Sequence, residues 1–536
     1  MRKTKQSVGV KLVAAALASA MVLGACGSGA AGTKAGATQA AETSAPAGAA
    51  DAGADAADQG AAKRDDLIVA LYADPSTLCA GFAASTVVSF CSRQFYDTLI
   101  KKEEDGSYSP SLATSWEYIN DGKDLSFEIR DDVYFHDGTK MTVDDVVFSY
   151  NAIIEGGYAD CATSAMDHME KVDDTHCILY FENQYGPGVE CVASDYMTIF
   201  PQAYYEKDPD FFKRNPIGTG AYKFVEWKTG DYIKMTANDD YFKGAPSIKD
   251  VTMKVFTDTS IATLALENGE VDVHIDPPTT DAKRLRENDN IQFSAVPGAT
   301  CTWVIFNFNE GSAFVDENLR LAVAHAIDKE AVMIGAIDGE GEIINQIYPN
   351  YFFGVDQDYQ APSYDPDLAK ELIAKTEYAG GATLSVDTSS NRKYFMPTEI
   401  IAAQLAEIGI QCTVNKLDSN AWFDDVFKGP TYDWNVVAFT PSINDFDDLY
   451  ALYRGGEGQN FGKVDFPELN EAYDKNHNST DSAVREEGCN EICRFMGDHA
   501  ICVPLYAQNN MLAANKDLKN VEAHPTKDYD VRSWSW

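Results

Sequence analysis

From residue 66 onward, short apolar or alternating runs take turns with helical patterns of hydrophobic residues. Leu67-Ile68-Val69-Ala70-Leu71 is the first pattern typical of a buried strand. Further strands are predicted over 125–129, 177–181, 233–236, 251–255, 271–275, 302–308, 410–414 and 434–439. Helices are predicted over 142–154, 260–269, 316–326, 367–375, 397–408 and 481–496. This alternation favours an α/β fold with partly parallel sheets.

The helix over 142–154 has a well-defined start and one apolar face. Thr142 can cap it and Asp145 follows three residues later, which is the spacing of a capping box. Val146, Tyr150 and Ile153 then fall on one side of the helix. We therefore expect this helix to pack on a core through that side.

The first 65 residues differ from the rest of the chain. A basic start is followed by an apolar stretch over 8–23 and by Leu23-Gly24-Ala25-Cys26, which together resemble a bacterial lipoprotein signal. We expect residues 1–25 to be the signal peptide and Cys26 to be the acylated first residue; ordinary cleavage would leave Cys26 a free thiol. Residues 26–65 contain almost nothing large to bury, so we expect the acylated cysteine and a flexible linker there.

The protein is thus expected outside the cytoplasm, on the outer face of the bacterial cell membrane, held to it only by lipid. Residues 66–536 are long enough for two or three hydrophobic cores. The formal charge of −40 argues against nucleic acid or acidic lipid as partners, because both select for basic surfaces.

Motifs of enzymes and metal sites are missing from the sequence. It has no HExxH, GxSxG, P-loop or CxxC pattern and no GxGxxG that opens a helix, and its eight histidines are scattered. We therefore expect no catalytic residue, no cofactor and no metal ion; an exported hydrolase would need a nucleophile and base that no motif supplies. The ten cysteines other than Cys26 could form disulfides, with Cys79–Cys91 and Cys161 with Cys177 or Cys191 as guesses, or could be reduced and buried.

Three blocks of sequence resemble one family of transport proteins. The first comprises YDTLI (96–100), DGSYSPSLATSWE (105–117), FEIR (127–130) and FHDGT (135–139); the second PIGTGAY (216–222), NDDYF (238–242) and GEVD (269–272); the third 316–328. In order and spacing they are similar to the peptide/nickel-type extracytoplasmic solute-binding proteins (family 5) of ATP-binding-cassette importers. Within them, Gly218-Thr219-Gly220 and His136 are interpreted as turns of the scaffold rather than as a site.

The resemblance implies a two-lobed fold of the periplasmic-binding-protein type, with two interlobe crossings. Lobe I would be 66–299 with an inserted subdomain over 106–219, lobe II 300–510, and 511–536 a return to lobe I. The crossings would fall near 301–308 and 502–510. The lobes would close over a small solute, most simply a di- or oligopeptide, and a monomer would deliver it to the membrane permease subunits of the importer.

Ligand contacts also follow from the resemblance, position by position. Arg392 falls where the dipeptide-binding branch has the arginine that clamps the ligand carboxylate. Where that branch has an aspartate for the ligand ammonium, a gapless alignment puts Ser442. Either Asp445 or Asp447 replaces it, or the ligand is not a simple free peptide. Further candidates for the cleft are the aromatic residues Trp303, Tyr394, Trp422 and Phe439, which could equally be packing, and Tyr72 and Ser85 after the first strand.

Two alternatives stay open from the sequence. The same fold serves nickel complexes, haem and oligosaccharides, so the class of solute is less certain than the fold. A lipid-anchored sensor that binds a peptide signal without bulk uptake would carry the same motifs.

Overall fold

The computed structural model describes residues 64–103, 106–441, 443, 445–456 and 460–536. The predicted signal peptide, the lipidation site Cys26 and most of the linker therefore lie outside the described residues, and so does Ser442.

A sheet of eleven strands runs through the described molecule, in the order β15-β14-β16-β12-β17-β11-β1-β10-β9-β8, with β13 paired to β17 beside this path. Its strands are β1 (Asp66–Leu71), β8 (Tyr222–Lys228), β9 (Tyr232–Ala237), β10 (Asp250–Val255), β11 (Val273–Ile275), β12 (Ile291–Phe306), β13 (Gly341–Ile343), β14 (Ala382–Ser389), β15 (Ile410–Leu417), β16 (Trp434–Phe439) and β17 (Cys502–Asn515). β1 is parallel to β10 and β11, and β14 is parallel to β15 and β16. The predicted α/β class is confirmed.

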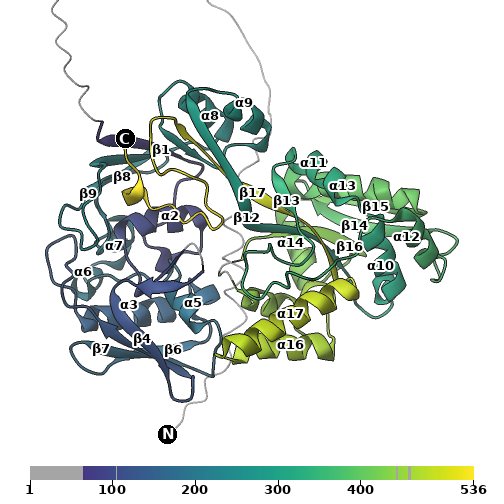
Figure 1. The fold of residues 1–536 in the computed structure, drawn as a ribbon, viewed down its shortest axis with the longest axis horizontal. Helices are drawn as coiled ribbons and strands as arrows, with labels where there is room; N and C mark the ends of the chain where they lie inside the picture. Colours follow the sequence, from purple (N-terminus) through teal and green to yellow (C-terminus); the bar gives the residue numbers. More distant parts are fainter. Residues whose placement is uncertain (1–63, 104–105, 442, 444, 457–459) are drawn as a thin grey trace, which may run out of the picture.

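The sheet passes between two lobes through β12 and β17 (Figure 1). The first half of β12 pairs only with β17, while Cys301–Phe306 pairs with β17 on one side and β16 on the other. The register shifts between Pro297 and Cys301, where the strand pair changes lobe. Two strands joined by hydrogen bonds can bend at such an irregularity while few other contacts change.

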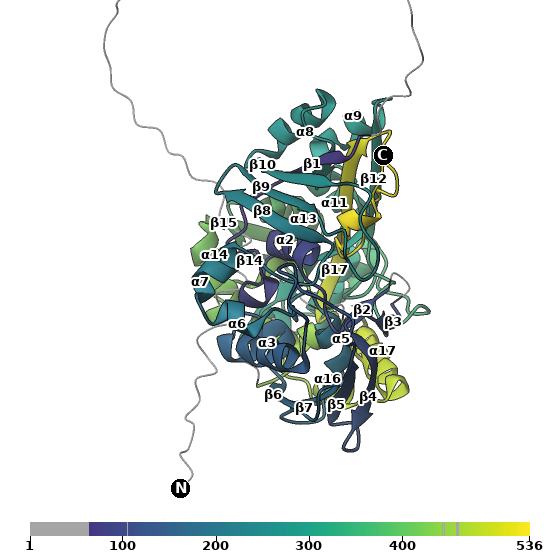
Figure 2. The same ribbon diagram turned by 90° about the vertical axis from the view of Figure 1, so that its left-hand side faces the viewer.

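Lobe I, on the left of Figure 1, packs most of its helices and its smaller sheets on one continuous core. These elements are α2 (Thr86–Phe95), β2 (Ile100–Lys102), β3 (Tyr108–Pro110), β4 (Ala113–Ile119), β5 (Asp124–Ile129), α3 (Val143–Gly156), β6 (Met166–Lys171) and β7 (His176–Phe181). The antiparallel sheet β4-β5-β7-β6 lies at the end of the lobe opposite α8 (Thr259–Glu267) and α9 (Ala282–Arg286), as Figure 2 shows.

Lobe II has a core on each face of its part of the sheet. On one face lie α10 (Glu317–Ala326), α11 (Lys329–Ile337), α12 (Pro366–Ile373) and α13 (Arg392–Glu407). On the other lie α14 (Ser419–Lys428), α16 (Pro467–Asn478) and α17 (Ser482–Asp498).

The predicted helices are confirmed, with one difference that matters for the site. Thr142 caps α3 and forms the expected capping box with Asp145. Helix α13 begins at Arg392, five residues before the predicted start at 397, because Asn391 caps it: its Oδ1 accepts a hydrogen bond from the Lys393 N–H at 3.0 Å. Helix α2 is not among the helices that the sequence predicts.

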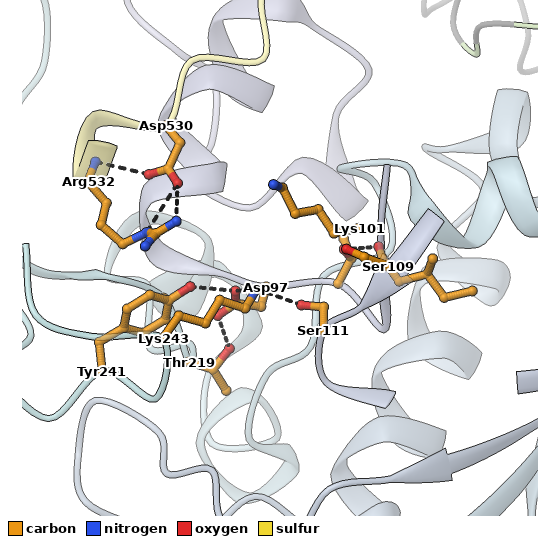
Figure 3. Close-up of polar contacts among 12 residues, drawn as sticks. Asp97, Lys101, Ser109, Ser111, Thr219, Tyr241, Lys243, Asp530 and Arg532 are labelled. Atoms are coloured by element: carbon orange, nitrogen blue, oxygen red, sulfur yellow. Dashed lines mark hydrogen bonds and ion pairs between the residues drawn. The ribbon is translucent and has the colours of Figure 1, made fainter. Parts of the chain in front are cut away.

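The motif blocks of lobe I meet at one buried carboxylate, Asp97 (Figure 3). Lys243 Nζ and Tyr241 Oη donate to its Oδ1 at 2.9 and 2.8 Å, and Thr219 Oγ1 donates to its Oδ2 at 2.9 Å. Lys243 Nζ also donates to Ser111 Oγ at 2.8 Å. The residues that carry the family resemblance in this lobe therefore hold its scaffold together.

The segment Gly218-Thr219-Gly220 packs against the end of α2, which explains why a residue without a side chain is needed there. A Cβ on Gly220 would lie 2.4 Å from the backbone carbon of Phe95. His136 bridges the same segment: its Nδ1 accepts from the Gly218 N–H at 3.3 Å, and its Nε2 donates to the Gly220 carbonyl at 3.0 Å. Burial lowers the pKa of His136 to about 4, so the ring is neutral at pH 7. The interpretation of both as scaffold is confirmed.

None of the ten cysteines in the described residues forms a disulfide bond, and eight of them are buried. The guessed disulfides are therefore wrong, and the alternative of reduced, buried cysteines is confirmed. None of the helices in the described ranges combines the length and apolar character that a membrane span requires.

Candidate functional site

A hollow lies at the carboxyl ends of the parallel strands β1 and β11. It contains about 290 Å³ of empty space, part of it open to solvent. Its lining is largely apolar and comes from β1, the first turns of α2, β11 and the C-terminal segment: Ala70, Leu71, Tyr72, Thr86, Val87, Phe90, Ile275, Asp276, Lys527 and Tyr529. The carboxyl ends of parallel strands are where open α/β sheets bind ligands.

An ion pair forms the polar side of this hollow. Lys527 Nζ donates to Asp276 Oδ2 at 2.5 Å. Both residues have left-handed backbone, with φ of 60° and 55°, which is uncommon for a lysine. Burial raises the pKa of Tyr72 and Tyr529, and the charge of Asp276 adds to both effects, so both phenols stay neutral.

A second charged cluster lies beside it in lobe I. Arg93 contacts Asp195 and donates to Asp528 Oδ1 at 2.6 Å, and its Nη1 donates to the Lys527 carbonyl at 3.2 Å. Burial raises the pKa of Asp195, whereas Arg93 lowers that of Asp528. The C-terminal segment is thereby fixed next to the hollow.

Lobe II presents the first turn of α13 to this region. Arg392 is exposed, and its Nη1 donates to the Ala336 carbonyl at the end of α11, 3.3 Å away. Lys393 is partly buried, and the charge of Lys527 on lobe I acts on its ammonium group. Two consecutive residues of this turn thus have different surroundings.

The four predicted aromatic wall residues are buried in the core of lobe II: Trp303, Tyr394, Trp422 and Phe439. Trp303 Nε1 donates to the Ile347 carbonyl at 2.8 Å, and the Tyr394 and Trp422 rings lie 4.4 Å apart. Packing accounts for these contacts, and a role as cleft walls stays a prediction. Of the two lobe I candidates, Tyr72 lines the hollow, while Ser85 is the N-cap of α2 without a side-chain cap bond.

Both predicted acids of lobe II have partners within the protein. Asp445 contacts Arg485 of α17 and accepts from Asn476 Nδ2 at 3.2 Å. Asp447 Oδ2 accepts from Tyr185 Oη of lobe I at 2.8 Å, and its Oδ1 lies 2.5 Å from His477 Nδ1. Asp447 therefore joins the lobes in this arrangement.

The lobes touch at two opposite ends. Near α16 and α17, the Gly186 N–H also donates to the His477 carbonyl at 2.7 Å. Near α9 and α11, Arg286 pairs with Glu340 at 2.5 Å, and Thr279 Oγ1 donates to Asp338 Oδ2 at 2.7 Å. These two ends lie at the bottom and the top of Figure 1.

Sequence analysis missed Lys393, Asp276 and Lys527. Lys393 stands next to the predicted Arg392, but its direction depends on where α13 begins. Lys527 lies in the C-terminal return, whose sequence has no strong periodicity, and only the fold brings it to β11. In the described residues, no group of three His, Cys, Asp or Glu side chains is arranged to hold a metal ion.

Comparison with known proteins gives a consistent result. The sequence model of "Bacterial extracellular solute-binding proteins, family 5 Middle" matches residues 107–461. The oligopeptide-binding protein AppA of Bacillus subtilis (strain 168) is 25% identical over 498 residues, which cover 88% of this chain and 91% of that protein.

Solved structures share the fold. HbpA2 from Haemophilus parasuis superposes with a TM-score of 0.79 at 21% identity, over 87% of this chain and 98% of that one. AppA from Bacillus subtilis in complex with a nonapeptide superposes with a TM-score of 0.70 at 24% identity, over 88% and 99%. The predicted two-lobed fold is therefore confirmed.

Proposed function

We propose that this chain, which belongs to family 5 of the bacterial extracellular solute-binding proteins, captures a di- or oligopeptide between its lobes and delivers it to an ATP-binding-cassette importer. The observation that carries the proposal is the hollow of lobe I at the ends of β1 and β11, whose polar side is the ion pair of Lys527 with Asp276. A ligand that contacts both lobes stabilises their closed arrangement, and the importer can recognise that arrangement. The oligopeptide-binding relative, which this chain matches over most of its length, supports a peptide as the solute.

The lobes are proposed to be 66–299 with 511–536, and 300–510, with 106–219 as a subdomain inserted in the first. They would rotate about β12 and β17, whose register shift supports a hinge there. The contact between Tyr185 and Asp447 would break when they open.

Arg392 is the proposed clamp for the peptide carboxylate. It is exposed, and its one described hydrogen bond goes to a main-chain carbonyl, which a ligand carboxylate can replace. Asp445 and Asp447 are proposed partners for the ammonium only in an arrangement that frees them from Arg485, Tyr185 and His477.

Cys26 is proposed to carry lipid and to tether the protein outside the cell membrane. Replacing Cys26 by Ser in the full chain should release the protein into the medium of expressing cells. Mass spectrometry of the wild type should find a diacylglycerol-modified N-terminus. A Cys26→Ser protein that stays on the membrane would contradict the anchor.

The peptide function is tested by purifying the domain from residue 64 without denaturation and screening it by thermal shift. The panel should hold peptides of two to nine residues, haem, nickel–histidine and oligosaccharides. We expect peptides to raise the melting temperature. Stabilisation by haem, nickel–histidine or sugars alone would instead assign a non-peptide solute, and cleaved peptides would indicate a hydrolase. Loss of uptake of the stabilising peptide on deletion of the gene would distinguish import from sensing.

A further inference from the structure

Tyr529 of the C-terminal segment buries a hydroxyl group whose proton has no acceptor. Its side chain lines the hollow at the ends of β1 and β11, and only 3% of the residue is exposed. In the part of the chain that the structure describes, no side chain or carbonyl accepts the proton on its Oη. The main-chain N–H of His524 approaches the same oxygen, but an N–H can only donate. A buried polar group of this kind is unfavourable unless a ligand supplies the partner.

The position of this hydroxyl is fixed by the surrounding lobe. The Tyr529 N–H donates to the Lys527 carbonyl at 2.8 Å, and the Tyr529 carbonyl accepts from Gln94 Nε2 of α2 at 3.0 Å. The Tyr529 ring packs edge-on against Phe90, with 6.2 Å between the two ring centroids. Because both the main chain and the ring are held, the hydroxyl cannot turn away to find an acceptor elsewhere.

The other polar side chains of the hollow have partners within the protein. Lys527 Nζ donates to Asp276 Oδ2 at 2.5 Å. Tyr72 forms a side-chain hydrogen bond with Thr86. The remaining residues of the lining are apolar. Tyr529 is thus the lining residue whose polar side-chain group still needs an acceptor.

The surroundings favour a neutral acceptor. Burial and the charge of Asp276 raise the pKa of Tyr529, so the phenol keeps its proton and can donate it. A carboxylate would be unfavourable beside Asp276, because the counterion of that acid, Lys527, is already engaged. A carbonyl oxygen needs no counterion, and the apolar walls suit an uncharged group next to it.

We propose that the Tyr529 hydroxyl donates a hydrogen bond to a peptide carbonyl oxygen of the ligand, and that the hollow receives the apolar side chain beside that carbonyl. The inference rests on the proposed peptide-binding function and names a contact of lobe I with the ligand. A hydrogen bond that forms only with the ligand strengthens binding and contributes nothing to the fold of the free protein. Affinity and stability should therefore respond differently when the hydroxyl is removed.

The test compares wild type with Tyr529→Phe, which keeps the ring and removes only the hydroxyl. Calorimetry on the domain from residue 64, with the peptides that the panel identifies, should show a Kd about three- to tenfold higher for the variant. The unliganded variant should melt no lower than wild type. An unchanged Kd overturns the inference and leaves peptide binding intact. A clearly lower melting temperature would mean that the hydroxyl has an acceptor within the protein, and it would overturn the inference as well.

Tyr150→Phe is the matched control. Tyr150 is buried in α3 of the same lobe, its hydroxyl also lacks a partner among the described residues, and it does not line the hollow. Its substitution should leave the Kd unchanged. An equal rise of the Kd in both variants would trace the effect to the core of lobe I and contradict the proposed contact.

Modified peptides identify the acceptor. Exchanging one carbonyl oxygen for sulfur, a weaker acceptor, should raise the Kd of wild type at one position and leave that of Tyr529→Phe unchanged. Glu or Lys in place of the apolar residue at this position should weaken binding to both proteins. If the effect of Tyr529→Phe disappears only with C-terminal amides, the acceptor is the carboxylate and the inference is wrong. If no peptide of the panel binds, the proposed function fails and the inference fails with it.

Discussion

The hydroxyl of Tyr185 in lobe I donates a hydrogen bond of 2.8 Å to Asp447 Oδ2 in lobe II. The pair lies at the interlobe contact near α16, where the Tyr185 and His477 rings are 5.3 Å apart. Because each partner sits on a different lobe, this bond exists only while the lobes are together. It links the buried side chain of Tyr185 directly to the balance between open and closed forms.

Tyr185→Phe should therefore shift the protein toward the open form. A hydrogen bond to a charged group contributes about 1.5–3 kcal/mol, so we expect the Kd for the stabilising peptide to rise about tenfold. Small-angle scattering of the unliganded variant should give a larger radius of gyration. Tyr180→Phe is the matched control, since its hydroxyl makes no recorded hydrogen bond in the described residues; equal effects of both variants would argue against the contact.

Removing the charge of Asp97 should destabilise lobe I without touching the cleft. Asp97→Asn leaves Lys243 partly buried beside a neutral amide, and breaking a buried ion pair from one side costs about 3 kcal/mol. Urea denaturation should show this loss for Asp97→Asn and a smaller one for the double variant Asp97→Asn/Lys243→Met. Additive losses would mean that the two residues do not interact.

His136 makes stability depend on pH in a defined window. Folding lowers its pKa from 6.5 to about 4, so between these values the unfolded chain binds a proton that the folded chain does not. Its contribution is fully present above pH 6.5 and is lost as the pH falls toward 4, by about 2–3 kcal/mol.

The measurement is the free energy of unfolding of wild type and His136→Asn between pH 7 and 4. The variant should lose less stability over this range, whatever its stability at pH 7. His274, whose pKa burial also lowers to about 4, stays in both proteins and serves as a common background. Parallel pH profiles would show that His136 is protonated in the folded protein as readily as in the unfolded chain.

The capping box of α3 was predicted from the sequence, and substitutions at Thr142 can test how much it contributes to stability. Thr142→Ala removes the acceptor for the Asp145 N–H and should lower the free energy of unfolding by about 1 kcal/mol. Thr142→Ser keeps the hydroxyl and should stay within about 0.5 kcal/mol of wild type. An equal loss in both variants would point to the methyl group rather than to the cap.

Local patterns in the sequence were enough for most elements of the fold. The strand over 434–439 and the cap at Thr142 depend on neighbouring residues alone, and the structure has both. The sequence pattern did not predict helix α2, because its sequence, TVVSFCSRQF, is rich in residues that suit strands as well. Only its packing in the lobe I core selects the helix. The start of α13 was placed too late because Pro397 was taken for its first turn, although Asn391 already caps it.

The sequence predicted the candidate site less well than it predicted the fold. The resemblance pointed to the segment around Arg392, but not to the direction of each side chain there. It indicated Asp445 or Asp447 as the partner of the ligand ammonium, and the structure gives both of them partners from distant segments, Arg485 and Tyr185.

The order of apolar and polar residues by itself determined most of the elements and the α/β class, because hydrophobic periodicity, caps and turns act over a few residues. The three motif blocks indicated the two-lobed family. Only the tertiary structure decided which charges meet, since Asp276 and Lys527 are far apart in the chain and form an ion pair in the fold. Electrostatic interactions depend on distance and burial in space, and neither is written in the neighbourhood of a residue along the chain.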